Sequence, residues 1–166
     1  MKKAESVLSR FINTLSSVFG NASIVSLVAV SLLVNAAVIM RYVFNAPFHF
    51  TEEISGYLIV ALVFLGLADT LRAERHIRID VVFVHLPKWI KNTLEICSLA
   101  LGLIFAGIFA WRTGQTVLTS YQIKMTSFGL WQVPLYLPQL LMPIGFVALA
   151  LQIIARAIKK IQGFRS

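Results

Sequence analysis

The ionisable side chains that could carry chemistry in the first half of the chain gather at the two ends of one apolar run, residues 54–68. Arg41, Glu52 and Glu53 precede the run. A mixed-charge cluster follows it, with the members Asp69, Arg72, Glu74, Arg75, His76, Arg78 and Asp80. Carboxylates at such positions can relay protons, bind cationic groups of a partner or neutralise a nearby arginine. Because Asp69 precedes Arg72 by one helical turn, we expect a local ion pair there rather than a proton relay.

The adjacent glutamates allow two interpretations. Thr51 can cap the helix that follows, and the helix dipole favours negative charge in a first turn, so Glu52 and Glu53 could simply begin a helix. However, neighbouring side chains on a helix project about 100° apart. At least one of the two carboxylates is therefore free to meet Arg41 or a partner protein.

Enzymatic chemistry is not expected from this sequence. The three histidines, His49, His76 and His85, fall in the connections between apolar segments, so there is no facing pair for a haem. Cys97 is the single cysteine and lies in an apolar run. The sequence contains no Walker-type loop, no HExxH pair and no GxSxG elbow. We therefore predict no catalytic residue, no cofactor and no metal site.

The elements that must position these residues are membrane helices. The 166 residues are 58% hydrophobic and 13% charged, which is too apolar for one small soluble core. We predict an all-α membrane protein, a single integral domain of residues 1–166, with four spans at about 20–40, 51–71, 92–111 and 134–155. The net charge of +8 comes from residues dispersed among apolar segments, so membrane lipid is expected as a partner and nucleic acid is not.

The first predicted span carries two further signals. Residues 3–19 place apolar side chains at spacings of three and four, which predicts an N-terminal amphipathic helix in the headgroup plane or, alternatively, the first turns of one long spanning helix. Asn35 is the isolated strongly polar residue that we identify in the spans. We expect it to bond a neighbouring helix.

Two features of the later spans concern packing. Gly102, Ala106, Ala110 and Gly114 recur at every fourth residue and predict a line along which another helix can approach closely. In the last predicted span, Pro138 fits a first turn. Pro143 is expected to kink the helix or to free a carbonyl group.

The distribution of positive charge predicts the orientation. Of the fifteen Lys and Arg residues, twelve lie in the two termini and the middle connection. Three, Arg41, Arg112 and Lys124, lie in the other connections. The positive-inside rule then places both termini in the cytoplasm and the Glu52–Glu53 end outside.

Several segments together resemble the small membrane subunit of tripartite ATP-independent periplasmic (TRAP) transporters. These are RYVFNAP at residues 41–47 with the two glutamates after it, FLGLA at 64–68, Arg72, HIRID at 76–80, Leu86–Pro87, and Pro134, Tyr136, Pro143 and Gly145 in the last segment. The resemblance covers nearly the whole chain. Phe50 departs from the pattern, because the family commonly has tryptophan there.

The resemblance implies a scaffold subunit in a bacterial inner membrane. Its main partner would be a larger, multi-span subunit that carries the substrate and sodium sites, and a periplasmic binding protein would deliver an organic acid. The partner-contact or structural residues would be Arg41, Asn45, Pro47, Glu52, Glu53, Asp69, Arg72, His76, Arg78 and Asp80. Two alternatives stay open from the residues alone, a self-sufficient four-helix proton-coupled transporter and a membrane assembly protein.

Overall fold

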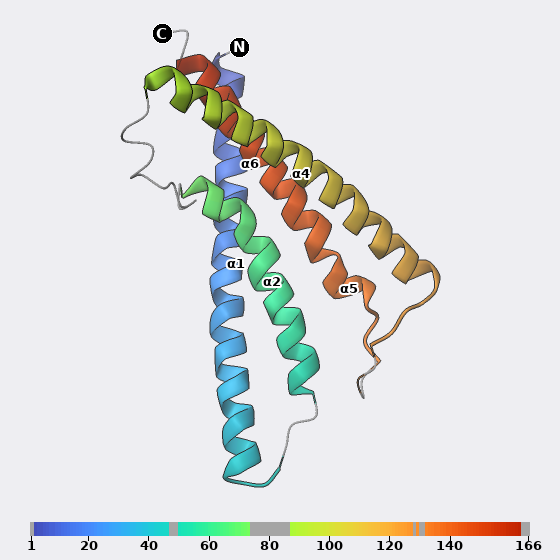
Figure 1. The fold of residues 1–166 in the computed structure, drawn as a ribbon. Helices are drawn as coiled ribbons and strands as arrows, with labels where there is room; N and C mark the ends of the chain where they lie inside the picture. Colours follow the sequence, from blue (N-terminus) through green and yellow to red (C-terminus); the bar gives the residue numbers. More distant parts are fainter. Residues whose placement is uncertain (1, 47–49, 74–86, 128, 130–131, 164–166) are drawn as a thin grey trace.

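Four long helices dominate the computed structural model, which describes residues 2–46, 50–73, 87–127, 129 and 132–163. They are α1 (Lys2–Tyr42), α2 (Thr51–Arg72), α4 (Lys88–Gln122) and α6 (Leu141–Gly163), and the short α5 (Tyr136–Gln139) precedes α6 (Figure 1). All four are long and apolar enough to cross a bilayer. The predicted all-α class with four membrane-spanning helices is confirmed.

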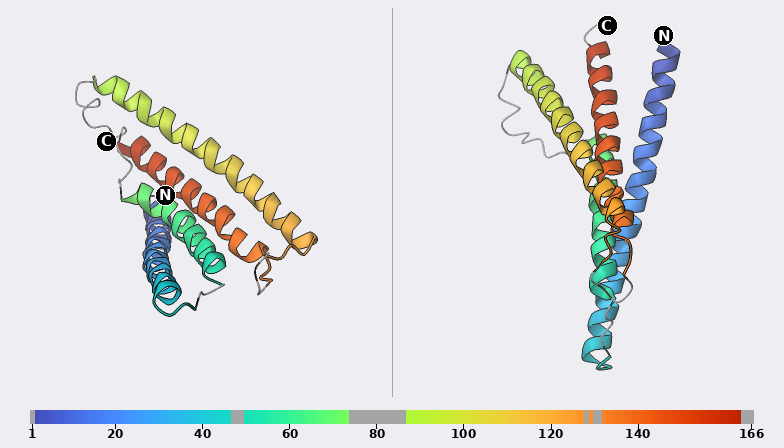
Figure 2. Two further views of the ribbon diagram at one scale, coloured as in Figure 1. Left: turned by 60° about the horizontal axis from the view of Figure 1, so that its bottom comes forward. Right: turned by 90° about the vertical axis from the view of Figure 1, so that its right-hand side faces the viewer.

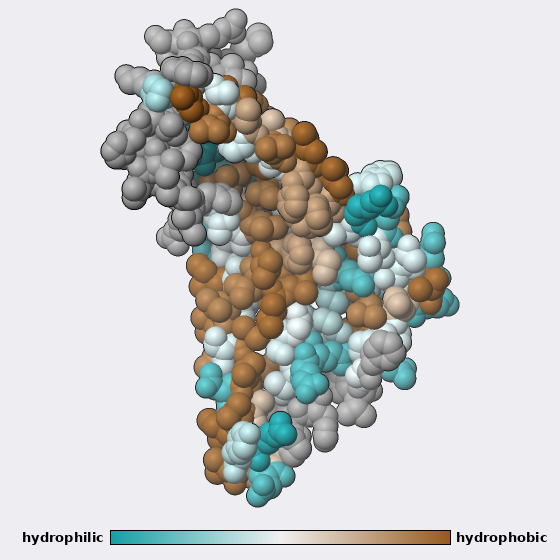
Figure 3. All heavy atoms as spheres, in the orientation of Figure 1, coloured by the Kyte–Doolittle hydropathy of each residue, from teal (hydrophilic) through white to brown (hydrophobic). Residues whose placement is uncertain are grey.

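The helices form an open layer rather than a closed bundle. α2 and α6 contact each other at the centre, α1 packs mainly on α2, and α4 packs mainly on α6 (Figures 1 and 2). Both termini lie at one end, here called the termini end. The opposite end, here called the loop end, holds the described residues of two connections, 43–46 with 50 after α1 and 123–127 with 129 and 132–135 after α4. Many large apolar side chains of α1 and α4 are therefore exposed, and Figure 3 shows a broad hydrophobic area with hydrophilic residues gathered toward the loop end.

The central contact between α2 and α6 depends on a glycine. A Cβ atom at Gly145 would lie 2.3 Å from the backbone oxygen of Phe64, so only glycine lets the two helices approach this closely. Beside it, the buried Phe146 ring meets Phe64 edge-on at a centroid distance of 5.4 Å. Phe105 and Phe109 of α4 extend this aromatic cluster, with centroids 6.1 and 5.4 Å from that of Phe146. The cluster joins the three helices at their crossing.

The small-residue line on α4 is used over part of its length. Ala106 is fully buried, and a Cβ at Gly102 would lie 3.3 Å from the side chain of Ile153 in α6. A Cβ at Gly114 would have nothing within 4 Å. Ala110 is half-buried. The line thus contacts α6 near Gly102 and Ala106 and opens toward the loop end.

Helix ends differ from the span ends that hydropathy suggested. α1 is one continuous helix of 41 residues, so residues 3–19 form the first turns of a long helix. Whether these turns lie in the headgroup plane stays a prediction. α4 continues to Gln122 instead of ending near residue 111, which places Arg112 inside the helix. Hydropathy marks where lipid contact stops, whereas the backbone hydrogen bonds of a helix can continue beyond that point.

The predicted effect of Pro143 is present as a break between α5 and α6. Proline has no N–H group, so the carbonyl of Gln139 cannot receive the usual hydrogen bond from residue 143. Leu140 forms the turn, where its N–H donates to the carbonyl of Tyr136 at 3.0 Å. Pro138 lies within α5, in a first turn as expected.

Candidate partner-binding site at the loop end

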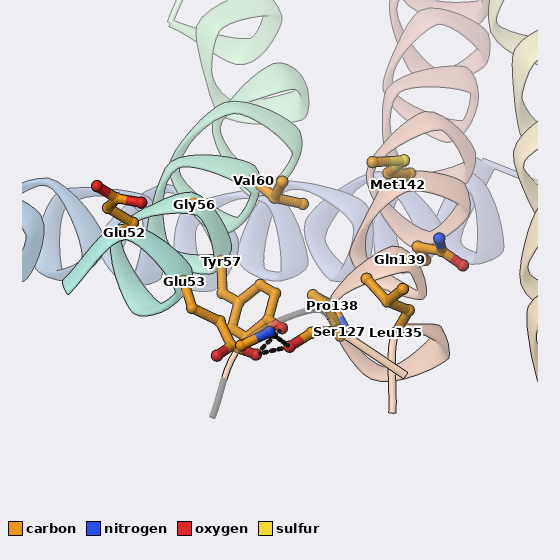
Figure 4. Close-up of a pocket in the computed structure, with 11 residues that line it drawn as sticks. Glu52, Glu53, Gly56, Tyr57, Val60, Ser127, Leu135, Pro138, Gln139 and Met142 are labelled. Atoms are coloured by element: carbon orange, nitrogen blue, oxygen red, sulfur yellow. Dashed lines mark hydrogen bonds between the residues drawn. The ribbon is translucent and has the colours of Figure 1, made fainter. Parts of the chain in front are cut away.

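Glu53 ties the start of α2 to the connection that follows α4. Its Oε1 atom accepts a hydrogen bond from the hydroxyl of Tyr57, one turn further along α2, at 2.8 Å. The same oxygen accepts a second hydrogen bond from the Ser127 hydroxyl (Figure 4). Ser127 lies 74 residues away in sequence, so this pair, here called the Glu53 clasp, joins distant parts of the chain.

The connection that supplies Ser127 is itself ordered by backbone hydrogen bonds. Ser127 N–H donates to Val133 O at 2.9 Å, and Leu135 N–H donates to Met125 O at 3.0 Å, so the two arms of the connection run antiparallel. The backbone of Gly129 lies against the Glu53 carboxylate, where a Cβ would be 1.9 Å from Oε2. Its N–H donates to the Ser127 hydroxyl at 3.1 Å. The clasp thus requires glycine at this position.

A pocket of about 670 Å³ opens beside the clasp. Its lining comes from the first turns of α2, the ordered connection, and the α5–α6 break, as Figure 4 shows: Glu52, Glu53, Gly56, Tyr57, Val60, Ser127, Gly129, Leu135, Pro138, Gln139 and Met142. The side-chain oxygen of Gln139 is buried and lacks a hydrogen-bond partner among the described residues. The pocket therefore combines acidic groups at its rim with an apolar wall.

The charged residues at this end that were predicted to contact a partner, Arg41, Glu52 and Glu53, are here called the loop-end rim, and their surroundings differ. Glu53 is engaged within the chain, whereas Glu52 is exposed. Arg41 is also exposed in the last turn of α1, and within the described residues it forms no ion pair with either glutamate. Asn45 takes a left-handed conformation with φ 51°, which lets the chain turn after α1. Pro47 lies outside the described residues.

The expected capping role of Thr51 is wrong. The N-cap position of α2 is Phe50, with helical dihedral angles and no side-chain cap hydrogen bond. Thr51 is already the first helical residue, and its buried hydroxyl has no partner in the part of the chain that the structure describes. A hydroxyl caps a helix only from the residue before the first turn, so Thr51 is one position too late.

At the termini end, the predicted ion pair between Asp69 and Arg72 is present. Arg72 contacts the Asp69 Oδ1 atom at 2.8 Å. The carboxylate lies over Gly20 of α1, where a Cβ would be 2.5 Å from the Asp69 carboxyl carbon. The pair therefore also fits α2 onto α1. His76, Arg78 and Asp80, the other predicted members of this cluster, lie outside the described residues.

A second group of charges at the termini end was not predicted as a unit. Glu95 of α4 forms ion pairs with Lys160 and, at 3.8 Å, with Arg156 of α6. Arg156 also donates to the carbonyl of Leu71, at the end of α2, at 3.5 Å. A cation there favours the negative end of the α2 dipole. Arg156 and Glu95 thus connect three helices.

The expectation that Asn35 is the isolated strongly polar group of the spans is wrong. Gln152, within the last span, is buried and bonded to α1: its Nε2 donates to Asn13 Oδ1 at 3.1 Å, and its Oε1 accepts from Ser16 at 3.3 Å. Ser23 of α1 similarly donates to Leu62 O of α2 at 2.7 Å. Gln152 could have been noticed in the sequence as a polar residue within an apolar run, but its partners depend on which helices pack together.

Asn35 itself bonds no neighbouring helix in the part of the chain that the structure describes. Its Nδ2 donates to Ser31 O of the same helix at 2.7 Å, and the side chain is exposed. Among the described residues, no group of three or more His, Cys, Asp or Glu side chains could hold a metal ion. The contacts at both ends thus join helices, and Arg41 and Glu52 stay exposed at the loop end.

Comparison with known proteins identifies the family. Residues 30–163 match the family described as tripartite ATP-independent periplasmic transporters, DctQ component. The chain is 24% identical to a putative TRAP transporter small permease protein of Haemophilus influenzae over 124 residues, which are 75% of each chain. A second putative small permease of the same organism is 35% identical over 72 residues, covering 43% of this chain and 45% of the relative.

A longer relative also matches. The isethionate TRAP transporter permease protein DctMQ of Oleidesulfovibrio alaskensis is 25% identical over 108 residues, 63% of this chain and 16% of that protein. The chain thus spans less than half the length of two of these three relatives. No solved structure matches. The family match covers most of the sequence, and this chain belongs to the DctQ component family of the tripartite ATP-independent periplasmic transporters.

Proposed function

We propose that this chain, a TRAP transporter small subunit, is a static scaffold that binds the large membrane subunit and carries no substrate itself. The observation that supports this proposal best is the open layer. α2 and α6 are covered on one side each by α1 and α4, while large apolar side chains of the outer helices remain exposed. An open layer encloses no path between its helices, but it offers broad surfaces to a larger protein and to lipid.

The use of the polar side chains supports the same role. Ser16, Ser23 and Gln152 bond neighbouring helices inside the layer. The ion pairs in the described residues lie at the termini end, and the Glu53 clasp lies at the loop end. Ionisable groups that move a proton or ion through a membrane normally face a bundle interior or a water-filled cavity. The contacts seen here instead fix helices to one another.

The loop-end rim is the part of the scaffold that we assign to partner contact. Glu52 and Arg41 are exposed charges, and Glu52 borders the pocket beside the clasp. A basic side chain of the partner that enters this pocket would meet Glu52 and the apolar wall together. The large subunit would carry the sodium and organic-acid sites, and a periplasmic binding protein would deliver the substrate. Both termini would face the cytoplasm of a bacterial cell, with the chain in its inner membrane.

Co-purification tests this proposal. A tagged form of this chain, expressed with the other transporter components, is expected to recover the large subunit at a fixed ratio. Glu52→Gln should lower that recovery, because one charge of a partly buried ion pair would lose its partner. Ser98→Ala on α4 is a control, since the Ser98 hydroxyl bonds only its own helix among the described residues. The scaffold role would be contradicted if this chain recovered no large subunit. It would also be contradicted if recovery did not depend on the membrane region of the large subunit.

A further inference from the structure

One stripe of α1 points away from the rest of the chain. Asn21, Val25, Val28, Leu32, Asn35 and Ile39 follow one another at alternating spacings of four and three residues, which places them on one face of a helix. The four aliphatic side chains are each more than half exposed. Ile12, Ser16, Ser23 and Val30, which are buried, occupy the opposite face. This set of six is called the outer stripe.

The outer stripe carries two amide groups that keep hydrogen-bonding atoms without a partner in the described chain. Asn35 uses its Nδ2 within α1, which leaves its Oδ1 without a partner among the described residues. Asn21 is exposed, and its side chain forms no hydrogen bond in the described part of the chain. The two residues are about 21 Å apart along the helix, so both fit within a hydrocarbon core of roughly 30 Å.

Contact with lipid leaves the polar groups of such a helix face without hydrogen-bond partners. Acyl chains offer no hydrogen bonds, so an unpaired amide inside the bilayer is costly, whereas another helix can satisfy it. A helix face that contacts only lipid needs aliphatic side chains such as the four in the stripe, and it does not need the two asparagines. The two asparagines, one near each end of the stripe, would fix the register of a helix that packs along it.

We propose that the outer stripe of α1 is the membrane docking surface for a transmembrane helix of the large subunit. This inference rests on the proposed scaffold function and names the surface that performs it. The stripe ends at Ile39, next to the exposed Arg41, and so continues into the loop-end rim. In the DctMQ relative, the matched region is 16% of a single chain that is named as a permease, so a region like this one is covalently joined there to a much longer stretch of permease sequence.

Site-specific photo-crosslinking tests the surface. The phenylalanine analogue p-benzoylphenylalanine is placed at Leu32 of the stripe or, as a matched control, at Leu101 of α4, because both side chains are 67% exposed. In membranes that contain the assembled transporter, Leu32 should give an adduct with the large subunit and Leu101 should give little. Adducts between two copies of this chain, no protein adduct at position 32, or equal yields from both positions would overturn the inference.

A second variant tests the amide directly. Asn35→Leu replaces the amide with an apolar side chain of similar size and should weaken association about threefold, which corresponds to one average interhelical hydrogen bond in a membrane. Energy transfer between labelled subunits in vesicles measures it, with Gln115→Leu, another exposed amide on α4, as control. If the complex forms but both Leu32 crosslinking and the Asn35 effect are absent, the stripe assignment falls and the scaffold function stands. If no complex forms, both fall.

Discussion

Gly145→Ala should separate the two central helices of the layer. The added Cβ would lie 2.3 Å from the Phe64 backbone oxygen, more than an ångström short of ordinary contact at 3.4 Å. Because the obstacle is backbone, no rotamer change relieves the overlap, and α2 and α6 must move apart. Overpacking of this kind costs about 1 to 3 kcal/mol. Alanine also gains up to about 1 kcal/mol of helix propensity over glycine, which a control must correct for.

Gly107→Ala on α4 is that control, since a Cβ there has nothing within 4 Å. Both variants are heated in detergent to a series of temperatures, and size-exclusion chromatography measures how much folded protein remains after each one. At about 2 to 4 °C per kcal/mol for a chain of this size, Gly145→Ala should melt about 2 to 12 °C below Gly107→Ala. Equal melting temperatures would refute the close α2–α6 approach and, with it, the arrangement of the layer.

The remaining predictions concern the two ends. Glu53→Gln should lower the melting temperature of the isolated chain, because the acceptor of two hydrogen bonds loses its charge. Glu52→Gln changes an exposed residue, so it should leave the melting temperature unchanged and lower only the recovery of the large subunit. The reverse pattern would contradict these separate roles of Glu53 and Glu52. In a chain whose single cysteine is replaced by serine, an impermeant thiol reagent added outside intact cells should label Asn45→Cys and Gln122→Cys but not Lys160→Cys. Labelling of Lys160→Cys from outside would reverse the proposed orientation.

Hydropathy predicted the number of spans because lipid imposes a simple length requirement on every crossing helix. It could not locate helix ends, since α4 continues past Arg112 through residues that are polar but still helical. The proline rule was more local and succeeded, because the missing N–H of Pro143 acts within its own turn. The fold class and the α5–α6 break were therefore accessible from sequence, while the helix lengths were not.

The contacts between helices were the least predictable part. Gln152 was visible as a polar residue, but its bonds to Asn13 and Ser16 exist only because α6 lies beside the first turns of α1. The difference between Glu53, which is bonded within the chain, and Glu52, which is exposed, likewise depends on the position of Ser127, 74 residues later in the sequence. Because adjacent carboxylates project about 100° apart, at least one was expected to be free, but helix geometry alone does not say which one.

Uptake by reconstituted liposomes tests the scaffold role most directly. Liposomes with a sodium gradient would contain this chain alone, the large subunit alone, or both, each with the binding protein and a labelled organic acid outside. The scaffold account predicts that this chain alone takes up no more acid than empty liposomes and that uptake requires the large subunit, at its highest with both present. Uptake by this chain alone above the empty-liposome level would contradict it.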